Sequence, residues 1–263
     1  MAKNQEMSMI YILIFFGISV FGFMMLYVYW QITRLPNNRP ERFQGKTSKK
    51  VVILAGDSIT HGRVGENYVN MLSRRFDQEQ YEFVNAGINS QLAWNLLQRI
   101  DDIIDCEPDF ITILIGTNDA NAATFKSEAE KYVKRMKLPQ TPNQSWFREN
   151  LFEIVSSLKQ KTSAHIALVS IPSLGEDPDN FAHKLSTEYS KTIEEVAKMG
   201  GVTYLPFHEK MLEVQKETPG NATYPIEKYL TKMIVACCKH YLLGKDWNSI
   251  GESYGFHLHI DYL

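Results

Sequence analysis

The sequence predicts an α/β domain of the doubly wound class, with helices on both faces of a mostly parallel five-stranded sheet. Three aliphatic runs carry this prediction, and each ends in glycine or a small polar cluster: residues 51–56, 83–87 and 110–116. Continuous apolar runs are typical of strands buried on both faces, as in a parallel sheet. Because helical patterns separate the runs, right-handed crossovers and a three-layer α/β/α sandwich are expected.

The rest of the chain supplies the other elements of this sandwich. Two further strands are expected at residues 166–171 and 202–205, and helices at 68–75, 92–100, 146–158, 181–199 and 226–241. Gly244 stands where the last helix would end. Residues 118–142 are polar and are expected to form a long connection.

Composition excludes several classes of function. The chain has 263 residues and a net charge of −2, which gives no basic field for nucleic acid. Its three cysteines, Cys106, Cys237 and Cys238, do not form a disulfide framework. No Cys/His cluster has the spacing of zinc ligands, so we expect no metal and no cofactor.

The N-terminal region predicts a membrane anchor. Residues 10–30 carry no charge, and as a helix they would rise about 31 Å, enough for a hydrocarbon core of about 30 Å. Tyr11 lies near one end and Tyr27, Tyr29 and Trp30 near the other, as in an aromatic belt. The alternative is a cleaved signal peptide, but its apolar region is normally shorter and a small-residue cleavage site should follow. We therefore expect a single-pass cell-membrane protein.

The expected domain organisation follows from this anchor. Residues 1–9 form a short tail and residues 10–30 the transmembrane helix. Residues 31–49 are polar, contain Pro36 and Pro40, and are expected to be a linker. The globular domain then comprises residues 50–263.

Three polar blocks stand at the carboxyl ends of the first three strands. They are Gly56-Asp57-Ser58, Asn85-Ala86-Gly87 and Gly116-Thr117-Asn118-Asp119. Ligands of open α/β sheets bind just past these ends, so Ser58, Gly87 and Asn118 are expected to meet. Each has an ordinary alternative: Ser58 in a polar turn, Gly87 permitting a tight turn, or Asn118 capping a helix.

The ordered set of blocks resembles the SGNH (GDSL-type) hydrolase family, which is esterase- and lipase-like. The resemblance runs from Lys50 to the C-terminus and implies a flavodoxin-like SGNH fold. It also implies that Ser58 attacks a carboxylic ester and forms an acyl-enzyme. The implied oxyanion hole consists of the backbone N–H groups of Ser58 and Gly87 and the side-chain amide of Asn118. The substrate would be a small-molecule, lipid or glycan ester.

The general base is the open question of the sequence. The family carries it in a C-terminal Asp-x-x-His block, and Asp261 is the only aspartate in residues 254–263. Three positions onward lies one residue past Leu263, so we expect the chain to stop before its catalytic histidine and closing helix. The alternative base is His257 or His259, although Tyr254, three before His257, cannot act as a carboxylate.

Other histidines do not resolve the question. His61 is close to Ser58 in sequence, but adjacency does not give the required geometry. Two alternatives to an ester hydrolase therefore stay open: a catalytically impaired or non-catalytic protein that keeps the cleft, and an acyltransferase acting on envelope glycans.

The membrane side of the domain also stays open. Lys3 is the only basic side chain before the span, whereas several follow it, including Arg34, Arg39 and Arg42. The positive-inside rule then favours a cytoplasmic domain. The family resemblance points the other way, because its anchored members often act outside the cell.

Overall fold

The structure is a computed structural model that describes residues 2–43, 45, 48–175, 177–217 and 229–254. The strands are β1 (Lys50–Gly56), β2 (Tyr81–Gly87), β3 (Phe110–Leu114), β4 (His165–Val169) and β5 (Thr203–Leu205). The helices are α1 (Ala2–Thr33), η1 (Pro40–Arg42), α2 (Ser58–His61), α3 (Tyr68–Arg75), α4 (Ala93–Leu97), α5 (Ile100–Ile104), α6 (Thr117–Ala122), α7 (Lys126–Met136), α8 (Gln144–Lys161), α9 (Phe181–Gly200), α10 (Phe207–Glu217), α11 (Tyr229–Leu243) and α12 (Trp247–Glu252). Asp261, His257 and His259 lie outside the described residues.

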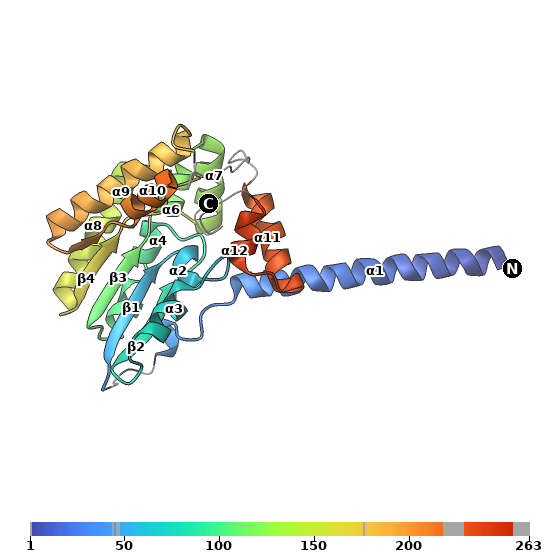
Figure 1. The fold of residues 1–263 in the computed structure, drawn as a ribbon, viewed down its shortest axis with the longest axis horizontal. Coiled ribbons are helices and arrows are strands. Elements are labelled where there is room, and N and C mark those ends of the chain that lie inside the picture. Colours follow the sequence, from blue (N-terminus) through green and yellow to red (C-terminus); the bar gives the residue numbers. More distant parts are fainter. Residues whose placement is uncertain (1, 44, 46–47, 176, 218–228, 255–263) are drawn as a thin grey trace.

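The five strands form one parallel sheet in the order β2-β1-β3-β4-β5, which confirms the predicted fold class (Figure 1). Gly56 at the end of β1 pairs with Gly87 of β2 and with Leu114 of β3. The three polar blocks therefore leave the sheet side by side, as the sequence predicts. Because β1 lies between β2 and β3, the strand order reverses at β1, and the ends of these strands form the topological switch point where such sheets bind ligands.

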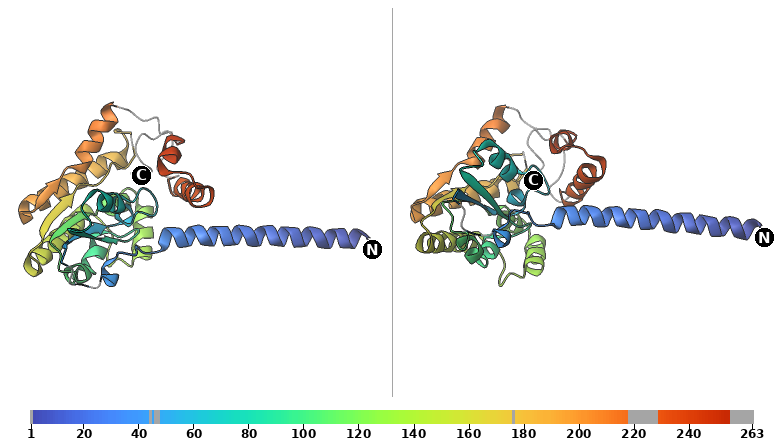
Figure 2. Two further views of the ribbon diagram at one scale, coloured as in Figure 1. Left: turned by 60° about the horizontal axis from the view of Figure 1, so that its bottom comes forward. Right: turned by 90° about the horizontal axis from the view of Figure 1, so that it is seen from below.

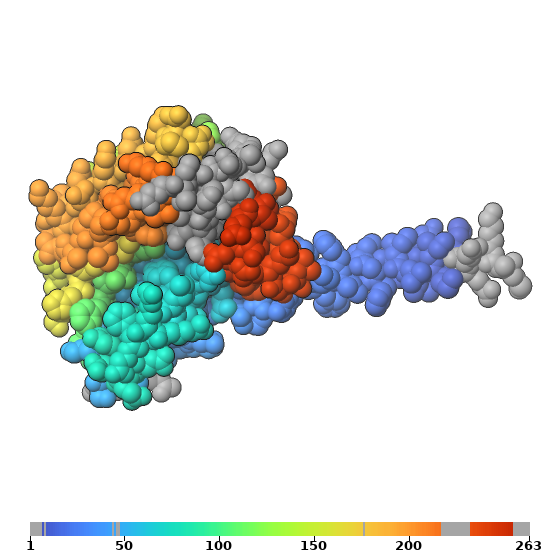
Figure 3. All heavy atoms as spheres, viewed as in Figure 1, coloured from blue at the N-terminus to red at the C-terminus, as the bar shows by residue number. Residues whose placement is uncertain are grey.

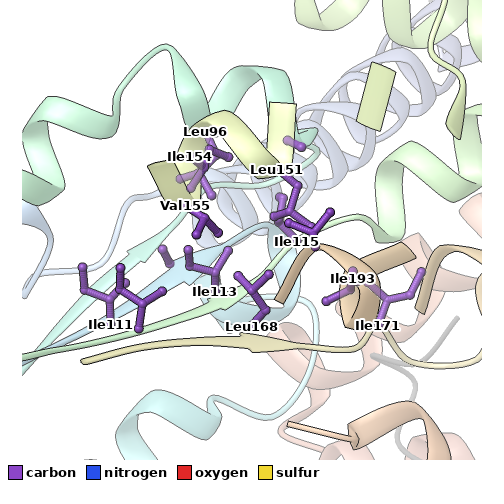
Figure 4. Close-up of a cluster of buried hydrophobic side chains, with 14 of the residues drawn as sticks. Leu96, Ile111, Ile113, Ile115, Leu151, Ile154, Val155, Leu168, Ile171 and Ile193 are labelled. Carbon is purple, nitrogen blue, oxygen red and sulfur yellow. The ribbon is translucent and has the colours of Figure 1, made fainter. Parts of the chain in front are cut away.

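A continuous apolar core covers one face of the sheet (Figure 4). Ile111 and Ile113 of β3 belong to one buried cluster with branched side chains from α8 and α9. The labelled members of this cluster are Leu96, Ile115, Leu151, Ile154, Val155, Leu168, Ile171 and Ile193. Burial of each such side chain contributes about 1.5–3 kcal/mol. This core makes the strand ends a rigid platform for the polar blocks.

Two local predictions differ from the structure. The helix expected at 92–100 is divided into α4 and α5, with Arg99 between them. The polar connection expected at 118–142 was wrong, because it contains α6 and α7. The pattern of α7 is mostly charged, and only Ala129 and Tyr132, three residues apart, are buried. So narrow an apolar stripe is easily taken for a loop.

The N-terminal helix α1 projects away from the domain in every view (Figures 1 and 2). The most apolar 18-residue stretch within Met9–Thr33 has a mean hydropathy of 2.4, and none of its side chains is buried. By length and composition this is the one helix in the described residues that would cross a membrane; a signal sequence near the N-terminus has the same properties. The domain end of α1 contacts α11 (Figure 3).

That end of α1 belongs to a second, smaller apolar cluster. Val28 is buried and Ile32 packs against the cluster. The other buried members come from α11, α12 and the residues that follow: Ala236, Cys237, Trp247, Ile250 and Tyr254. The last turns of α1 are therefore packed into the domain rather than free of it.

The segment after α1 lies along the edge of β2. Asn38 accepts a hydrogen bond from the Asn85 backbone N–H at 2.9 Å, and its side chain donates to the Phe83 carbonyl at 2.9 Å. Phe43 then packs against the main core. This part of the expected linker is thus held against the sheet.

Candidate active site

Ser58 opens the four-residue helix α2 directly after β1. The preceding residue, Asp57, caps this helix, and its Oδ1 accepts from the Ile59 N–H at 3.1 Å. The cap leaves the backbone N–H of Ser58 among the donors that a helix start cannot use internally. Ser58 is half-buried, at the edge of the sheet where β1, β2 and β3 end. The residue thus combines a hydroxyl with an oriented backbone donor.

Asn118, just after the end of β3, hydrogen-bonds to the segments that follow β1 and β2. Its Nδ2 donates to Asp57 Oδ2 at 3.2 Å and to the Gln91 carbonyl at 3.1 Å. Asp57 is the residue before Ser58, and Gln91 lies in the loop after β2. The structure therefore brings Asn118 beside the serine block, as expected from the strand order.

Tyr132 of α7 fixes the orientation of that amide. Its hydroxyl donates to Asn118 Oδ1 at 2.7 Å, and the ring is buried. Because Oδ1 is held from one side, Nδ2 must point to the opposite side, toward Asp57 and Gln91. Sequence reasoning missed Tyr132; the only signal was its position three residues after Ala129 on a narrow apolar stripe.

Gly87 serves the packing of α2 against β2. Its N–H donates to the Asn85 side-chain Oδ1 at 2.9 Å, and Asn85 Nδ2 donates to the Thr60 carbonyl at 2.8 Å. A Cβ on Gly87 would clash with the backbone of Thr60 and His61. The glycine lets α2 approach the strand end, and its N–H already has a partner in this structure.

The loop after β2 contains a strained serine. Ser90 has φ +64° and is the third residue of a turn closed by the Gln91 N–H and the Ile88 carbonyl at 3.4 Å. Glycine or asparagine is usual at such a position, because a side chain with positive φ is disfavoured. Strain of this kind persists where the surroundings demand it and clusters at functional sites. Its neighbour Gln91 is the residue that accepts from Asn118.

Arg99 holds this loop to the strand ends. Its Nε donates to Gln91 Oε1 at 2.7 Å, and Nη2 donates to the Ala86 carbonyl at 2.7 Å. Burial lowers the pKa of Arg99 to about 10, so the guanidinium stays charged at neutral pH. Strand end, loop and Asn118 therefore form one connected network.

Comparison with known proteins identifies the family. Residues 54–224 match the family described as GDSL-like lipase/acylhydrolase, which includes all three blocks. The chain belongs to the GDSL-like lipase/acylhydrolase family. This match confirms the family expected from the sequence and supports an ester hydrolase as its class. A search of the curated proteins found no match.

Solved structures share the fold of this GDSL-like hydrolase. One is a variant of Axe2, an acetyl xylan esterase from Geobacillus stearothermophilus, at 19% identity and a TM-score of 0.55, covering 68% of this chain and 85% of that chain. Another is the acetyl xylan esterase AlAXEase, at 20% identity and a TM-score of 0.54, covering 64% of this chain and 82% of that chain. At identities this low, the structural similarity shows a common fold and nothing more specific.

Two buried carboxyl groups lie within the hydrolase site. Burial raises the pKa of Asp57 to about 7 and that of Asp119 to about 8. Asp119 accepts from the Ala93 N–H at 3.1 Å, and Asp57 accepts from Ile59 and Asn118. Both therefore order the loops by hydrogen bonding to their neighbours, the role expected from the sequence.

The rings of His61, His208 and His240 hydrogen-bond to groups other than Ser58. His61 is buried, with Nδ1 2.5 Å from Asn89 Oδ1 and Nε2 2.9 Å from the Arg34 carbonyl. Burial lowers the pKa of His61, which keeps the ring neutral. In the part of the chain that the structure describes, no histidine makes a hydrogen bond to Ser58, Asp57 or Asp119.

Proposed function

We propose that this GDSL-like hydrolase cleaves carboxylic esters through a covalent acyl-enzyme on Ser58. The hydroxyl oxygen attacks the ester carbonyl and its proton passes to a base. The alcohol then leaves, and water releases the acid from the serine. The observation that carries the proposal is the hydrogen bond from Asn118 to Asp57, because it places an amide donor beside the residue that precedes Ser58.

The proposed oxyanion hole has donors from three blocks. We assign the Ser58 N–H and the Asn118 side-chain amide, as the sequence suggests. For the third donor we propose the Ser90 N–H in place of the expected Gly87 N–H, because Gly87 donates to Asn85 and Ser90 directly precedes Gln91, which accepts from Asn118. Both hydrogen bonds of Asn118 Nδ2 are long, at 3.1 and 3.2 Å, so one of them is readily exchanged for an oxyanion.

The proposed base is a histidine outside the described residues. His61 is excluded from this role, because both ring nitrogens are within hydrogen-bond distance of other groups. His257 and His259 are the candidates on this chain, with Asp261 as the proposed orienting carboxylate. A carboxylate is needed to hold the imidazole in the tautomer that accepts a proton from serine. Separate His257→Ala and His259→Ala variants distinguish the two.

The experiment that tests the proposal is ester hydrolysis by the full chain in detergent. p-Nitrophenyl acetate is the first substrate, because the structural neighbours are named as acetyl xylan esterases; acetylated xylan follows. Ser58→Ala should lose essentially all turnover above background, whereas the exposed control Ser163→Ala should keep it. Equal turnover by the wild type and Ser58→Ala would exclude Ser58 as the nucleophile.

A second candidate is a non-catalytic protein that binds an ester or glycan in the same cleft. It is favoured because no histidine of the described residues hydrogen-bonds to Ser58. Binding of acetylated xylan without hydrolysis, by a chain that retains its fold, would support it. Product analysis with an added alcohol acceptor separates hydrolysis from acyl transfer to a glycan.

We also propose that α1 is an uncleaved single-pass membrane anchor, with residues 50–263 as the hydrolase domain. Cleavage after the apolar stretch would remove Val28, which is buried in the cluster formed with α11 and α12. Residues 9–27, before this contact, would span about 28 Å as a helix, close to the thickness of a hydrocarbon core. Retention in the membrane pellet after carbonate extraction, with an intact N-terminus by mass spectrometry, tests the anchor.

A further inference from the structure

Two arginines meet where α1 enters the domain. Arg34 directly follows α1, and its carbonyl lies 2.9 Å from His61 Nε2. Arg63 lies two residues after His61, and its carbonyl accepts from the Tyr241 hydroxyl of α11 at 2.5 Å. The ends of α1 and α2 and the side of α11 therefore converge on this pair. Neither residue has a role in the proposed hydrolysis.

Within the described residues, the two guanidinium groups have no carboxylate partner. The Nε of each arginine is buried and has no hydrogen-bond partner in the structure. Burial and the positive charge of Arg34 both lower the pKa of Arg63, whereas its interaction with Tyr241 raises it. In the described ranges, no carboxylate oxygen lies within 4.0 Å of either one. Nearby Arg39, by contrast, pairs with Glu41 at 3.3 Å.

The surroundings place this pair at the edge of the apolar helix. The Arg34 guanidinium lies over the Trp30 ring, 4.6 Å from its centroid. Aromatic rings at the end of a spanning helix lie at the level of the lipid headgroups. If α1 spans a membrane, both arginines face the layer of phosphates. On α11, which contacts α1, Ile234 and Val235 are exposed apolar side chains.

We propose that Arg34 and Arg63 bind the phosphate of an anionic phospholipid headgroup at the base of α1. This inference rests on the proposed membrane anchor and not on the proposed hydrolysis. Guanidinium groups suit phosphate because they donate in pairs to its oxygens, and arginines near an anionic lipid surface are attracted to it.

The site would also orient the catalytic end of the domain. Ser58 and His61 lie at opposite ends of α2, about 5 Å apart along its axis. Because His61 contacts Arg34, a lipid held by Arg34 would fix α2 relative to the membrane. Substrate would then be taken from the layer next to the bilayer surface.

The test uses the full chain in vesicles of phosphatidylcholine alone or of phosphatidylcholine and phosphatidylglycerol in equal parts. Native mass spectrometry after detergent release measures the lipid retained by the wild type, by an Arg34→Gln/Arg63→Gln variant and by an Arg74→Gln/Arg75→Gln control. The control pair is exposed on α3 and removes the same charge. The wild type and the control should retain phosphatidylglycerol, and the Arg34/Arg63 variant should lose most of it.

Three further measurements keep the result interpretable. Arg34→Lys/Arg63→Lys should retain an intermediate amount, because charge remains and paired donation is lost. Equal retention by the Gln variant and the wild type would overturn the proposal. Thermal stabilisation of the detergent-solubilised chain by inorganic phosphate, without retention of lipid, would overturn the lipid assignment in favour of a free phosphate. Carbonate extraction of each variant shows whether the anchor itself has failed.

Discussion

The Tyr132 hydroxyl donates to Asn118 Oδ1 at 2.7 Å, from a helix fourteen residues further along the chain. This contact decides which way the amide of Asn118 points. The side chain then presents Nδ2 toward the end of β1, where Ser58 begins α2. A tyrosine remote from the three sequence blocks is therefore a positioning residue for the proposed oxyanion hole.

Tyr132→Phe should lower kcat with little change in KM. The change leaves Asn118 Oδ1 without its partner, which costs about 1–3 kcal/mol for a buried group and frees the amide to rotate. A loss of roughly 10-fold in kcat corresponds to about 1.4 kcal/mol. The matched control is Tyr204→Phe, which removes a hydroxyl that donates to Glu209 at 2.7 Å. Equal kinetics for the two variants would contradict the positioning role.

Asn118→Ala should reduce kcat by about 10²–10³-fold, the usual effect of removing one oxyanion donor. Asn150→Ala is the control, because it also removes a buried amide, one that donates to the Trp146 carbonyl on α8. Ester hydrolysis and thermal unfolding of both variants separate a catalytic loss from a loss of fold. If both lose stability and only Asn118→Ala loses turnover, the assignment holds; unaltered turnover of Asn118→Ala rejects it.

Ser90→Gly should stabilise the protein and keep its activity. Glycine adopts φ +64° without the side-chain penalty, which is about 1–2 kcal/mol per residue, and the backbone N–H stays in place. Ser90→Val should lower both stability and turnover, because a β-branched residue resists positive φ. Denaturant unfolding and kinetics of the pair provide the measurement. If Ser90→Val folds with a changed turn and keeps full activity, the assignment of the Ser90 N–H to the oxyanion hole is wrong.

Asp119→Asn should change how stability depends on pH. Burial raises the pKa of Asp119 to about 8 in the folded protein, from its ordinary value of 3.8. The contribution of this carboxyl to stability is therefore fully present below about pH 4 and is lost as pH rises toward 8, because the unfolded chain releases the proton first. The variant cannot ionise, so its advantage in Tm over the wild type should grow between about pH 4 and pH 8 and level off above pH 8.

The Tm change expected for Asp119→Asn has a predictable size and a matched control. Each kcal/mol recovered raises Tm by about 2–4 °C in a domain of this size. Asp246 serves as the control, since hydrogen bonds from Ser249 lower its pKa, which is the opposite direction. The Tm difference for Asp246→Asn should not grow over the same range. A constant difference for Asp119→Asn would show that this carboxyl is not buried in its neutral form.

The sequence predicted the sheet and its functional edge because both depend on local signals. Apolar runs that end at Gly56 and Gly87 mark strand ends, and crossover rules place those ends together. The roles within the edge were harder to predict. Gly87 is needed for the close approach of α2, and its N–H is used by Asn85, two residues away. A sequence block shows that a glycine is present but not which partner its N–H has.

Contacts between distant segments could not be predicted from the sequence. The pairing of Tyr132 with Asn118 depends on how α7 folds back, and the charged pattern of α7 hid that helix. The meeting of Arg34 with His61 and of Arg63 with Tyr241 depends on packing among α1, α2 and α11. No periodicity records such three-way contacts, so they emerged only from the folded chain.

The most direct test of the central claim is the mass of the Ser58 peptide after the full chain reacts with a fluorophosphonate. An activated serine loses its proton to the base and displaces fluoride, which leaves a phosphonyl group on its oxygen. The account predicts a single adduct on the peptide that contains Ser58, none in Ser58→Ala, and a slower reaction in Asn118→Ala. A folded wild-type chain that stays unlabelled at Ser58, or is labelled at another serine, would contradict it.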